Sequence, residues 1–376
     1  MLRSVIKVGT SSLIDDETGT LALSSIAGIC EVLARLQRRG HQVVLVSSGA
    51  VGAGCLKMGL SRRPADLAAR QALAAVGQVH LMRMYDDLLT SLKVTCAQVL
   101  LTPENLASRP QYLNARNTFE ALLRMGTIPI VNENDTVAVS QLRFGDNDTM
   151  SAQVAALVHA DYLFLLTDVD ALYTSNPSLD PQAKRIAEVH DLSELAVDTS
   201  TSGTQWGTGG MATKLTAARI ATAAGCNVVV GAASAPDRIV RVLSGELHGT
   251  LFHAHPRPLR SRRRWILAVP PKGSLWLDAG AVRAVRDKRK SLFASGVVEV
   301  EGEFNAEEAV RLCGPDGQEF ARGLSNYASG DARRLRGLAS SRYDKALGYV
   351  GPEEVCHRDN VALLEVHRND ESGDEM

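Results

Sequence analysis

Apolar and polar residues alternate along the chain in blocks that predict strands followed by helices. Short, nearly continuous apolar runs, such as residues 43–46 and 162–167, are typical of buried strands. Between Leu21 and Arg39 the apolar residues recur at helical spacing, and Gly40 ends the predicted helix. Two further helices are predicted at 65–76 and 79–92. This alternation continues to Asp168 and predicts parallel βαβ units with right-handed crossovers, and hence an α/β fold.

The composition of the chain changes near Pro256, which predicts a boundary between two domains. Residues 1–254 carry the alternation of strands and helices, and residues 255–273 are rich in arginine and proline, which is typical of a linker. Residues 274–366 contain short strands and turn signals, which predicts a small, mostly β domain. The acidic residues 367–376 are expected to form a disordered tail. The total of 376 residues is long enough for two such domains.

Charge and cysteine content argue against several classes of protein. Lys and Arg number 41 against 42 Asp and Glu, so the formal net charge of −1 does not point to nucleic acid or a membrane. The six cysteines are scattered, with no CxxC motif and no Cys/His pair at metal-ligand spacing, which argues against a disulfide framework or a zinc site. The N-terminus lacks the apolar core of a signal peptide, and no run approaches the roughly 18 apolar residues that span a bilayer. We therefore expect a cytoplasmic protein.

Polar residues follow several predicted strands at the point where each strand ends. The segment 145–170 has them at both ends: Asn147 and Asp148 begin its helix, and Thr167 and Asp168 end its strand. Similar clusters occur at 47–48 and 132–135. One such cluster is usually a helix cap or an Asx turn. Several of them at the carboxyl edge of one parallel sheet predict a ligand site.

Two lysines lie beside glycines at the ends of predicted elements. Lys7 precedes Gly9 at the end of the first strand, and Lys214 follows Gly210 in the first turn of a helix. Glycine-rich turns before helices expose backbone N–H groups to anions. Taken singly, Lys7 equally fits a side chain that reaches solvent from an edge strand, and the glycines before Lys214 fit an ordinary hinge before a helix. Taken together, they favour a site for a highly anionic ligand such as a nucleoside triphosphate.

The sequence also lacks the GxSxG and HExxH motifs of familiar hydrolases and the HRDxxxxN and DFG signatures of protein kinases. If the reaction is phosphoryl transfer, catalysis rests mainly on positioning and on neutralising the charge of the transferred group. A carboxylate acceptor, with a pKa of about 4, is already ionised at neutral pH and needs no general base. The lack of an obvious catalytic histidine or cysteine therefore favours a carboxylate acceptor.

Six motifs, in this order, resemble those of the amino acid kinase family. They are KVGTSS (7–12), SSGAVGAG (47–54), NENDTVA (132–138), FGDND (144–148), LLTDVDALYT (165–174) and GTGGMATK (207–214). The C-terminal part resembles a PUA domain. The resemblance implies an amino acid kinase fold, an open, mainly parallel sheet sandwiched by helices, followed by a small, mostly β PUA domain. It is strongest to members that use ATP and Mg²⁺ to phosphorylate the γ-carboxylate of L-glutamate, the first step of proline biosynthesis.

The resemblance implies a role for each matched residue. Lys7 and Lys214 would contact the ATP phosphates, and Asp148 would orient both lysines. The glutamate site would comprise Ser48, Asn134, Asp135, Asp146 and Asn147. The ATP site would comprise Lys7, Thr167, Asp168, Thr208, Gly209, Gly210, Met211, Ala212, Thr213 and Lys214, with Arg143 near the phosphates. Mg²⁺ would be bound mainly through the nucleotide phosphates, and no residue is predicted to be a protein ligand of a metal.

The resemblance further implies feedback inhibition by proline, assembly as a homodimer or homotetramer, and functional coupling to glutamyl phosphate reductase. It does not imply RNA binding, because PUA domains need not retain it and the basic run at 283–290 is typical of a solvated helix face. Two alternatives stay open from the sequence. One is another small-molecule kinase of the same fold, and the other is an RNA-binding protein that acts through the PUA domain.

Overall fold

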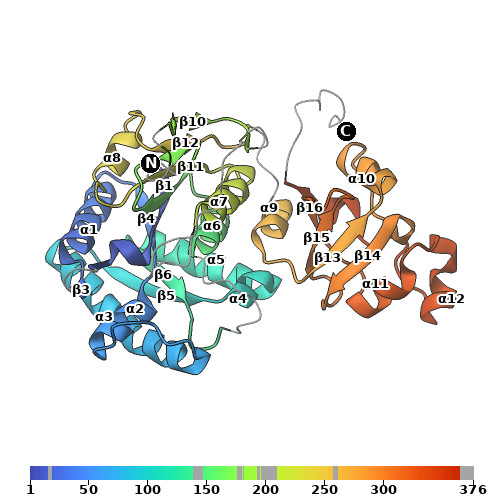
Figure 1. Ribbon diagram of the computed structural model, residues 1–376, viewed down its shortest axis with the longest axis horizontal. Helices are drawn as coiled ribbons and strands as arrows, with labels where there is room; N and C mark the ends of the chain where they lie inside the picture. Colours follow the sequence, from blue (N-terminus) through green and yellow to red (C-terminus); the bar gives the residue numbers. More distant parts are fainter. Residues whose placement is uncertain are drawn as a thin grey trace. The chain divides into compact units, whose positions relative to one another are not determined.

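The computed structural model describes residues 1–15, 19–138, 147–175, 180, 182–192, 195, 210–256 and 261–364 (Figure 1). The chain divides into two compact units, Met1–Pro258 and Leu259–Met376. Each unit has a hydrophobic core of its own. Among the described helices, none has both the length and the apolar character needed to cross a bilayer.

The first unit is built around a mainly parallel sheet. Within its described residues, eight strands lie in the order β10-β12-β11-β7-β1-β4-β6-β5, and those from β11 to β5 run parallel. These strands are apolar along most of their length because helices cover both faces of the sheet, which confirms the predicted α/β fold. The bounds are β1 Arg3–Val8, β4 Gln42–Ser47, β5 Cys96–Leu101, β6 Ile128–Glu133, β7 Tyr162–Thr167, β10 Glu188–Val189, β11 Asn227–Ala232 and β12 Thr250–Phe252. Short strand pairs, β2 Ile14–Asp15 with β3 Thr20–Leu21 and β8 Leu172–Tyr173 with β9 Arg185–Ile186, accompany this sheet.

The helices of the first unit separate the two faces of the sheet into different environments. Ile6 of β1 and Phe164 of β7 share a hydrophobic cluster with apolar residues of α1, α3 and α8. On the other face, toward which the neighbouring Lys7 points, α6 and α7 lie side by side (Figure 1). The bounds are α1 Leu23–Arg38, α2 Ala50–Lys57, α3 Leu67–Ser91, α4 Pro103–Ala107, α5 Arg109–Arg124, α6 Asn147–Val158, α7 Met211–Ala223 and α8 Arg238–Val242.

One long helix, α3, replaces the two helices predicted at 65–76 and 79–92, so that prediction was wrong. The helix continues through Gly77 without a break. A Cβ atom at Gly77 would lie 1.9 Å from the carbonyl oxygen of Ala50 in α2, and one at Gly54 would lie 1.9 Å from the carbonyl oxygen of Leu73 in α3. Both glycines therefore allow α2 and α3 to pack with their backbones in close approach, and neither ends a helix.

The second unit has a smaller mixed sheet, which confirms the predicted mostly β domain. Of its described strands, five lie in the order β14-β13-β15-β16-β17, and only the β13–β15 pair is parallel. The strands are β13 Gly273–Leu277, β14 Val297–Gly302, β15 Ala309–Cys313, β16 Glu319–Leu324 and β17 Val361–Leu363. The helices are α9 Ser261–Ala268, α10 Ala279–Arg286, α11 Ser329–Leu335 and α12 Tyr343–Leu347.

Residues 255–273, predicted as a linker, include helix α9. Trp265, Ile266 and Leu267 of this helix are buried, and the helix packs against β16 and β17. The buried Arg322 of β16 donates a hydrogen bond to the carbonyl oxygen of Val269 at 3.0 Å, which ties the end of this segment to the second sheet. Because several arginines precede Trp265, the apolar face of this helix is not apparent from the sequence pattern. The predicted tail, 367–376, lies outside the described residues.

The six cysteines are present without disulfide bonds, and all but the half-buried Cys96 are buried. Burial raises the pKa of the Cys30 thiol in the first unit to about 12. It likewise raises the pKa of the Cys356 thiol in the second unit to about 12. Thiols of this kind are protonated and unreactive at neutral pH.

Candidate active site

A buried cluster of three charged side chains lies at the carboxyl end of β1, and we call it the charge centre. Lys7 Nζ lies 2.6 Å from Asp148 Oδ1, and Lys214 Nζ lies 3.2 Å from Asp148 Oδ2. Asp148 is 0% exposed, Lys7 6% and Lys214 7%. Three charges almost entirely removed from water are costly to bury, which is typical of a functional site and unusual in a structural core.

Three elements that are distant in sequence bring the charge centre together. Lys7 projects from β1 toward α6 and α7, while Asp148 and Lys214 lie in the first turns of these two helices. Thr213 Oγ1 donates a hydrogen bond to Asp148 Oδ2 at 2.9 Å and joins the two helix ends. A carboxylate in the first turn of α6 interacts favourably with the helix dipole. The amino ends of both helices face the same point, which suits an anionic ligand.

The electrostatics of the charge centre also favour an anion. Burial alone would raise the pKa of the Asp148 carboxyl, but the charges of Lys7 and Lys214 and the hydrogen bonds from Lys7 and Thr213 outweigh it and hold that pKa below its usual range. The carboxylate is therefore ionised at neutral pH. Two ammonium groups then share one carboxylate, and the surplus positive charge is best compensated by a bound anion such as phosphate.

A second polar network begins one residue earlier, at Asn147. Its Nδ2 atom donates to Ser48 Oγ after β4 at 2.9 Å and lies 3.1 Å from Asn132 Oδ1 on β6. Asn132 Nδ2 in turn donates to Gln78 Oε1 of α3 at 2.8 Å. The adjacent residues Asn147 and Asp148 thus belong to different networks, and this arrangement can hold two ligands side by side.

Two carboxyl groups at the end of β6 have perturbed pKa values. Burial, together with the nearby charges of Asp135 and Glu104, raises the pKa of Glu133 to about 8. Burial also raises the pKa of Asp135 to about 6, although Arg63 and Arg70 act in the opposite direction. Carboxyl groups with such shifts are more common at binding and catalytic sites than elsewhere. In its ionised form, Asp135 can accept a ligand ammonium group.

The predicted nucleotide residues follow β7 and precede α7. Thr167 is buried at the end of β7, and its Oγ1 atom donates to Asp168 Oδ1 at 2.8 Å. Gly210 is the residue before α7, and Met211, Ala212, Thr213 and Lys214 form the first turn of this helix. Asn134 and Asp135 lie in the turn after β6. The predicted residues Arg143, Asp146, Thr208 and Gly209 lie outside the described residues.

Of the residues in this region, Gln78 was not predicted from the sequence, and Asn132 and Glu133 were predicted only as members of the polar cluster 132–135, without a role of their own. Asn132 is the first residue of the NENDTVA motif and the first polar residue at the end of its strand, so the pattern offered a signal. Gln78 offered none, because it fell in the supposed gap between two helices. The raised pKa of Glu133 arises from burial and neighbouring carboxylates, which spacing along the chain does not reveal.

Comparison with known proteins places these residues in a family context. A model of the amino acid kinase family matches residues 3–232, a range that contains the whole charge centre. The chain belongs to the amino acid kinase family. A PUA domain model matches residues 273–347. The two matches confirm the family and the C-terminal domain predicted from the sequence motifs.

Curated relatives of this amino acid kinase family chain align over nearly its whole length. Glutamate 5-kinase from Microcystis aeruginosa is 53% identical over 363 residues, which cover 96% of each chain. Glutamate 5-kinase from Thermosynechococcus vestitus is 54% identical over 362 residues, or 96% of this chain and 98% of the relative. The enzyme of that name from Nostoc punctiforme is 53% identical, over 96% of this chain and 99% of the relative.

Proposed function

We propose that this protein is a glutamate 5-kinase, which transfers a phosphoryl group from ATP to the γ-carboxylate of L-glutamate and forms L-glutamyl 5-phosphate. The observation that carries the proposal is the buried charge centre, in which Lys7 and Lys214 share the carboxylate of Asp148. Relatives of 53% and 54% identity that carry this name support the choice of reaction.

In the proposed reaction, the two lysines stabilise the phosphoryl group during transfer. Charge spreads over the oxygens of this group in the transition state, and fixed positive charges in a dry site stabilise it most strongly. Asp148 is a positioning residue that holds both ammonium groups near one point, at 2.6 and 3.2 Å. Because the lysines are held before the ligands bind, little reorganisation is needed at the moment of reaction.

The acceptor would bind beside the charge centre, on the network of Asn147. Ser48 and Asn147 offer a hydroxyl and an amide, and Asp135 offers a carboxylate to the α-ammonium group of glutamate. We include Asn134 and Asp146 in this site. The γ-carboxylate of the substrate is ionised at neutral pH and attacks the γ-phosphorus without a general base.

The nucleotide would lie across the ends of β7 and α7. Thr167 and Asp168 would contact it from one side, and the backbone of residues 208–212 with Thr213 and Lys214 would bind its phosphates from the other. Both carboxylate oxygens of Asp148 are within ion-pair distance of a lysine. This donor set therefore fits a Mg²⁺ ion held mainly by phosphate oxygens, where it would neutralise part of their charge.

An acceptor-specificity assay tests the proposal. The protein is incubated with ATP, Mg²⁺ and hydroxylamine, which traps acyl phosphates as hydroxamates, and with L-glutamate, L-aspartate, N-acetyl-L-glutamate or carbamate as acceptor. We expect hydroxamate from L-glutamate well above that from the other acceptors. N-acetyl-L-glutamate keeps the γ-carboxylate but has no ammonium group, so it separates recognition of the ammonium from the chemistry.

A lack of hydroxamate from glutamate, together with product from another acceptor, would replace glutamate by a different substrate of the same fold. The Lys214→Ala variant serves as the control for contaminating kinases, since it should lose the activity. We further propose a cytoplasmic homodimer or homotetramer that proline inhibits. Light scattering, and the same assay with added proline, test these two statements.

A further inference from the structure

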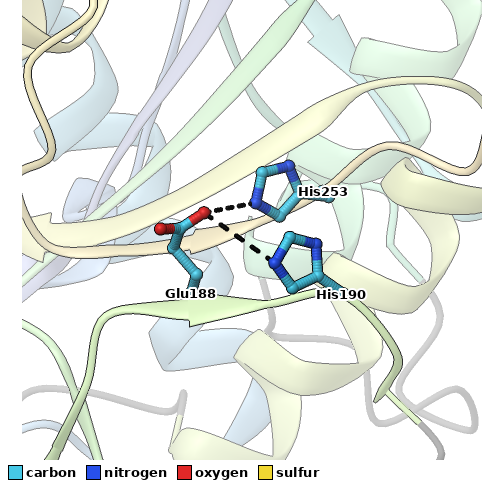
Figure 2. Close-up of side chains that lie close together, drawn as sticks. All are labelled: Glu188, His190 and His253. Carbon is cyan, nitrogen blue, oxygen red and sulfur yellow. Dashed lines mark hydrogen bonds and ion pairs between the residues drawn. The ribbon is translucent and has the colours of Figure 1, made fainter.

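Three side chains outside the charge centre converge at the opposite edge of the first sheet: Glu188, His190 and His253 (Figure 2). Their candidate ligand atoms all lie within 4.8 Å of one another. His253 Nε2 lies 2.8 Å from Glu188 Oε2, and His190 Nε2 lies 4.0 Å from the same oxygen. The two imidazole rings are stacked, with centroids 4.1 Å apart and an interplanar angle of 9°. We call this set the His–Glu cluster.

We propose that the His–Glu cluster is a binding site for a transition-metal ion of the zinc type. Two imidazoles with one carboxylate are a ligand set that suits Zn²⁺, whereas Mg²⁺ and Ca²⁺ prefer oxygen ligands alone. Two ligand atoms bound tetrahedrally to zinc at about 2.0–2.1 Å lie about 3.3 Å apart. The observed 2.8 and 4.0 Å lie on either side of this separation. Because the two imidazole planes are stacked at an angle of 9°, at least one of these solvent-reaching rings must rotate before both nitrogens face one ion.

The backbone around the His–Glu cluster is fixed by the register of two strands. Glu188 and His190 are two residues apart on and just after β10, so their side chains point to the same face. His253 follows β12, whose Leu251 and Phe252 pair with Glu188 and Val189 in a parallel ladder. The backbone N–H of His253 donates to Val189 O at 3.0 Å. The next residue, Ala254, donates to Asn227 Oδ1 at 2.9 Å. The three Cα positions are therefore set before any ion binds.

The site is separate from the charge centre. His253 lies at the amino end of β11, since β12 runs antiparallel to β11 and Phe252 pairs with Val228. Thr167 pairs with Ala232 at the carboxyl end of β11. The six residues Asn227–Ala232 span about 17 Å. An ion at the His–Glu cluster would thus tie β10 to β12 and stabilise the folded unit, and it would not contact the transferred phosphoryl group.

The three residues of the His–Glu cluster do not form a spacing motif in the sequence, and for this reason no metal site was predicted there. That prediction rested on cysteine pairs and on Cys/His spacing along the chain. Here the ligands come from an i, i+2 pair and a residue 63 positions later, which become neighbours only when β10 and β12 pair.

The test measures Zn²⁺ binding to the tag-free, chelator-treated full chain without nucleotide, by equilibrium dialysis and isothermal titration calorimetry. We expect saturable one-to-one binding and a higher Tm in the presence of Zn²⁺. His253→Ala and His190→Ala should each weaken the affinity at least about tenfold, because even partners that only support metal ligands contribute about 10–100-fold. Glu188→Gln keeps the size of the side chain and should also weaken binding, which covers the case of an alanine variant that fails to fold.

Two control variants make the result specific. His248→Ala removes a histidine that pairs with Glu246 at 3.1 Å in a similar surface setting, with no third ligand among the described residues. Cys96→Ser removes the half-buried thiol. Both should bind Zn²⁺ as the wild type does. No binding by the wild type, unchanged binding in both His253→Ala and His190→Ala, or an equal loss in either control would each overturn the proposal.

Discussion

Replacing Asp148 with asparagine should destabilise the protein by about 3–5 kcal/mol. The change keeps the shape of the side chain and removes the negative charge that Lys7 and Lys214 share at 2.6 and 3.2 Å. At an effective dielectric constant of about 20, these two attractions are worth about 6 and about 5 kcal/mol. The cost of burying three ions offsets much of this, and removing one partner from a buried ion pair typically costs about 3–5 kcal/mol.

Urea denaturation followed by circular dichroism measures the effect, and its pH dependence provides an internal check. The folded-state pKa of Asp148 lies below its unfolded value, so its stabilising contribution is present above about pH 4 and is lost as the pH falls through the folded-state value. The difference between wild type and Asp148→Asn should therefore be constant near neutral pH and shrink in acid.

The matched control is Thr213→Val, which removes one hydrogen bond to Asp148 and should cost only about 1 kcal/mol. Adding ATP with Mg²⁺ should restore part of the stability of Asp148→Asn, because phosphate oxygens can replace the lost carboxylate as partners of the lysines. A loss below about 1 kcal/mol at neutral pH, the range of an exposed ion pair, would refute the reasoning.

Three further changes test other parts of the structure. Lys214→Ala should lower kcat at least about 100-fold while the KM for glutamate changes little, and equal losses in both would contradict a role in the transition state. The wild-type kcat/KM for glutamate should fall as the pH decreases through about 6, where Asp135 becomes protonated. Asp135→Asn should have a low kcat/KM that shows no such inflection. Gly77→Ala should destabilise the first unit by about 1–3 kcal/mol, since its Cβ would meet the carbonyl oxygen of Ala50 at 1.9 Å, whereas Val76→Ala on an exposed position should be nearly neutral. Equal stability of these two variants would rule out the close approach of α2 and α3.

The sequence predicted the parallel sheet well, because buried strands such as 162–167 show continuous apolar runs that few other elements share. Prediction from the sequence failed where the role of a residue depends on a contact with a residue distant in the chain. Gly77 was interpreted as the gap between two helices, although its role is to admit the carbonyl oxygen of Ala50. The apolar residues of α9 were hidden because their partners on β16 and β17 come more than fifty positions later.

For the site, the identities of Lys7, Asp148 and Lys214 could be predicted from the six motifs taken together. Their distances could not, because residues 7, 148 and 214 meet only through the order in which the strands assemble around β1. The hydrogen bond from Asn132 of β6 to Gln78 of α3 likewise joins residues 54 positions apart and depends on the tertiary fold. Spacing along a chain identifies candidates, and pairing of elements decides which of them touch.

The rate at which the buried thiols react reports how often the surrounding structure opens transiently. With a pKa of about 12, Cys30 and Cys356 each carry a thiolate fraction of about one in 10⁵ at pH 7, and neither side chain reaches solvent. An alkylating reagent can therefore modify them only when the surrounding structure opens. Cys30 belongs to the first unit and Cys356 to the second. The labelling rates of the two thiols would therefore measure how often each unit opens in the intact enzyme, with no introduced probe.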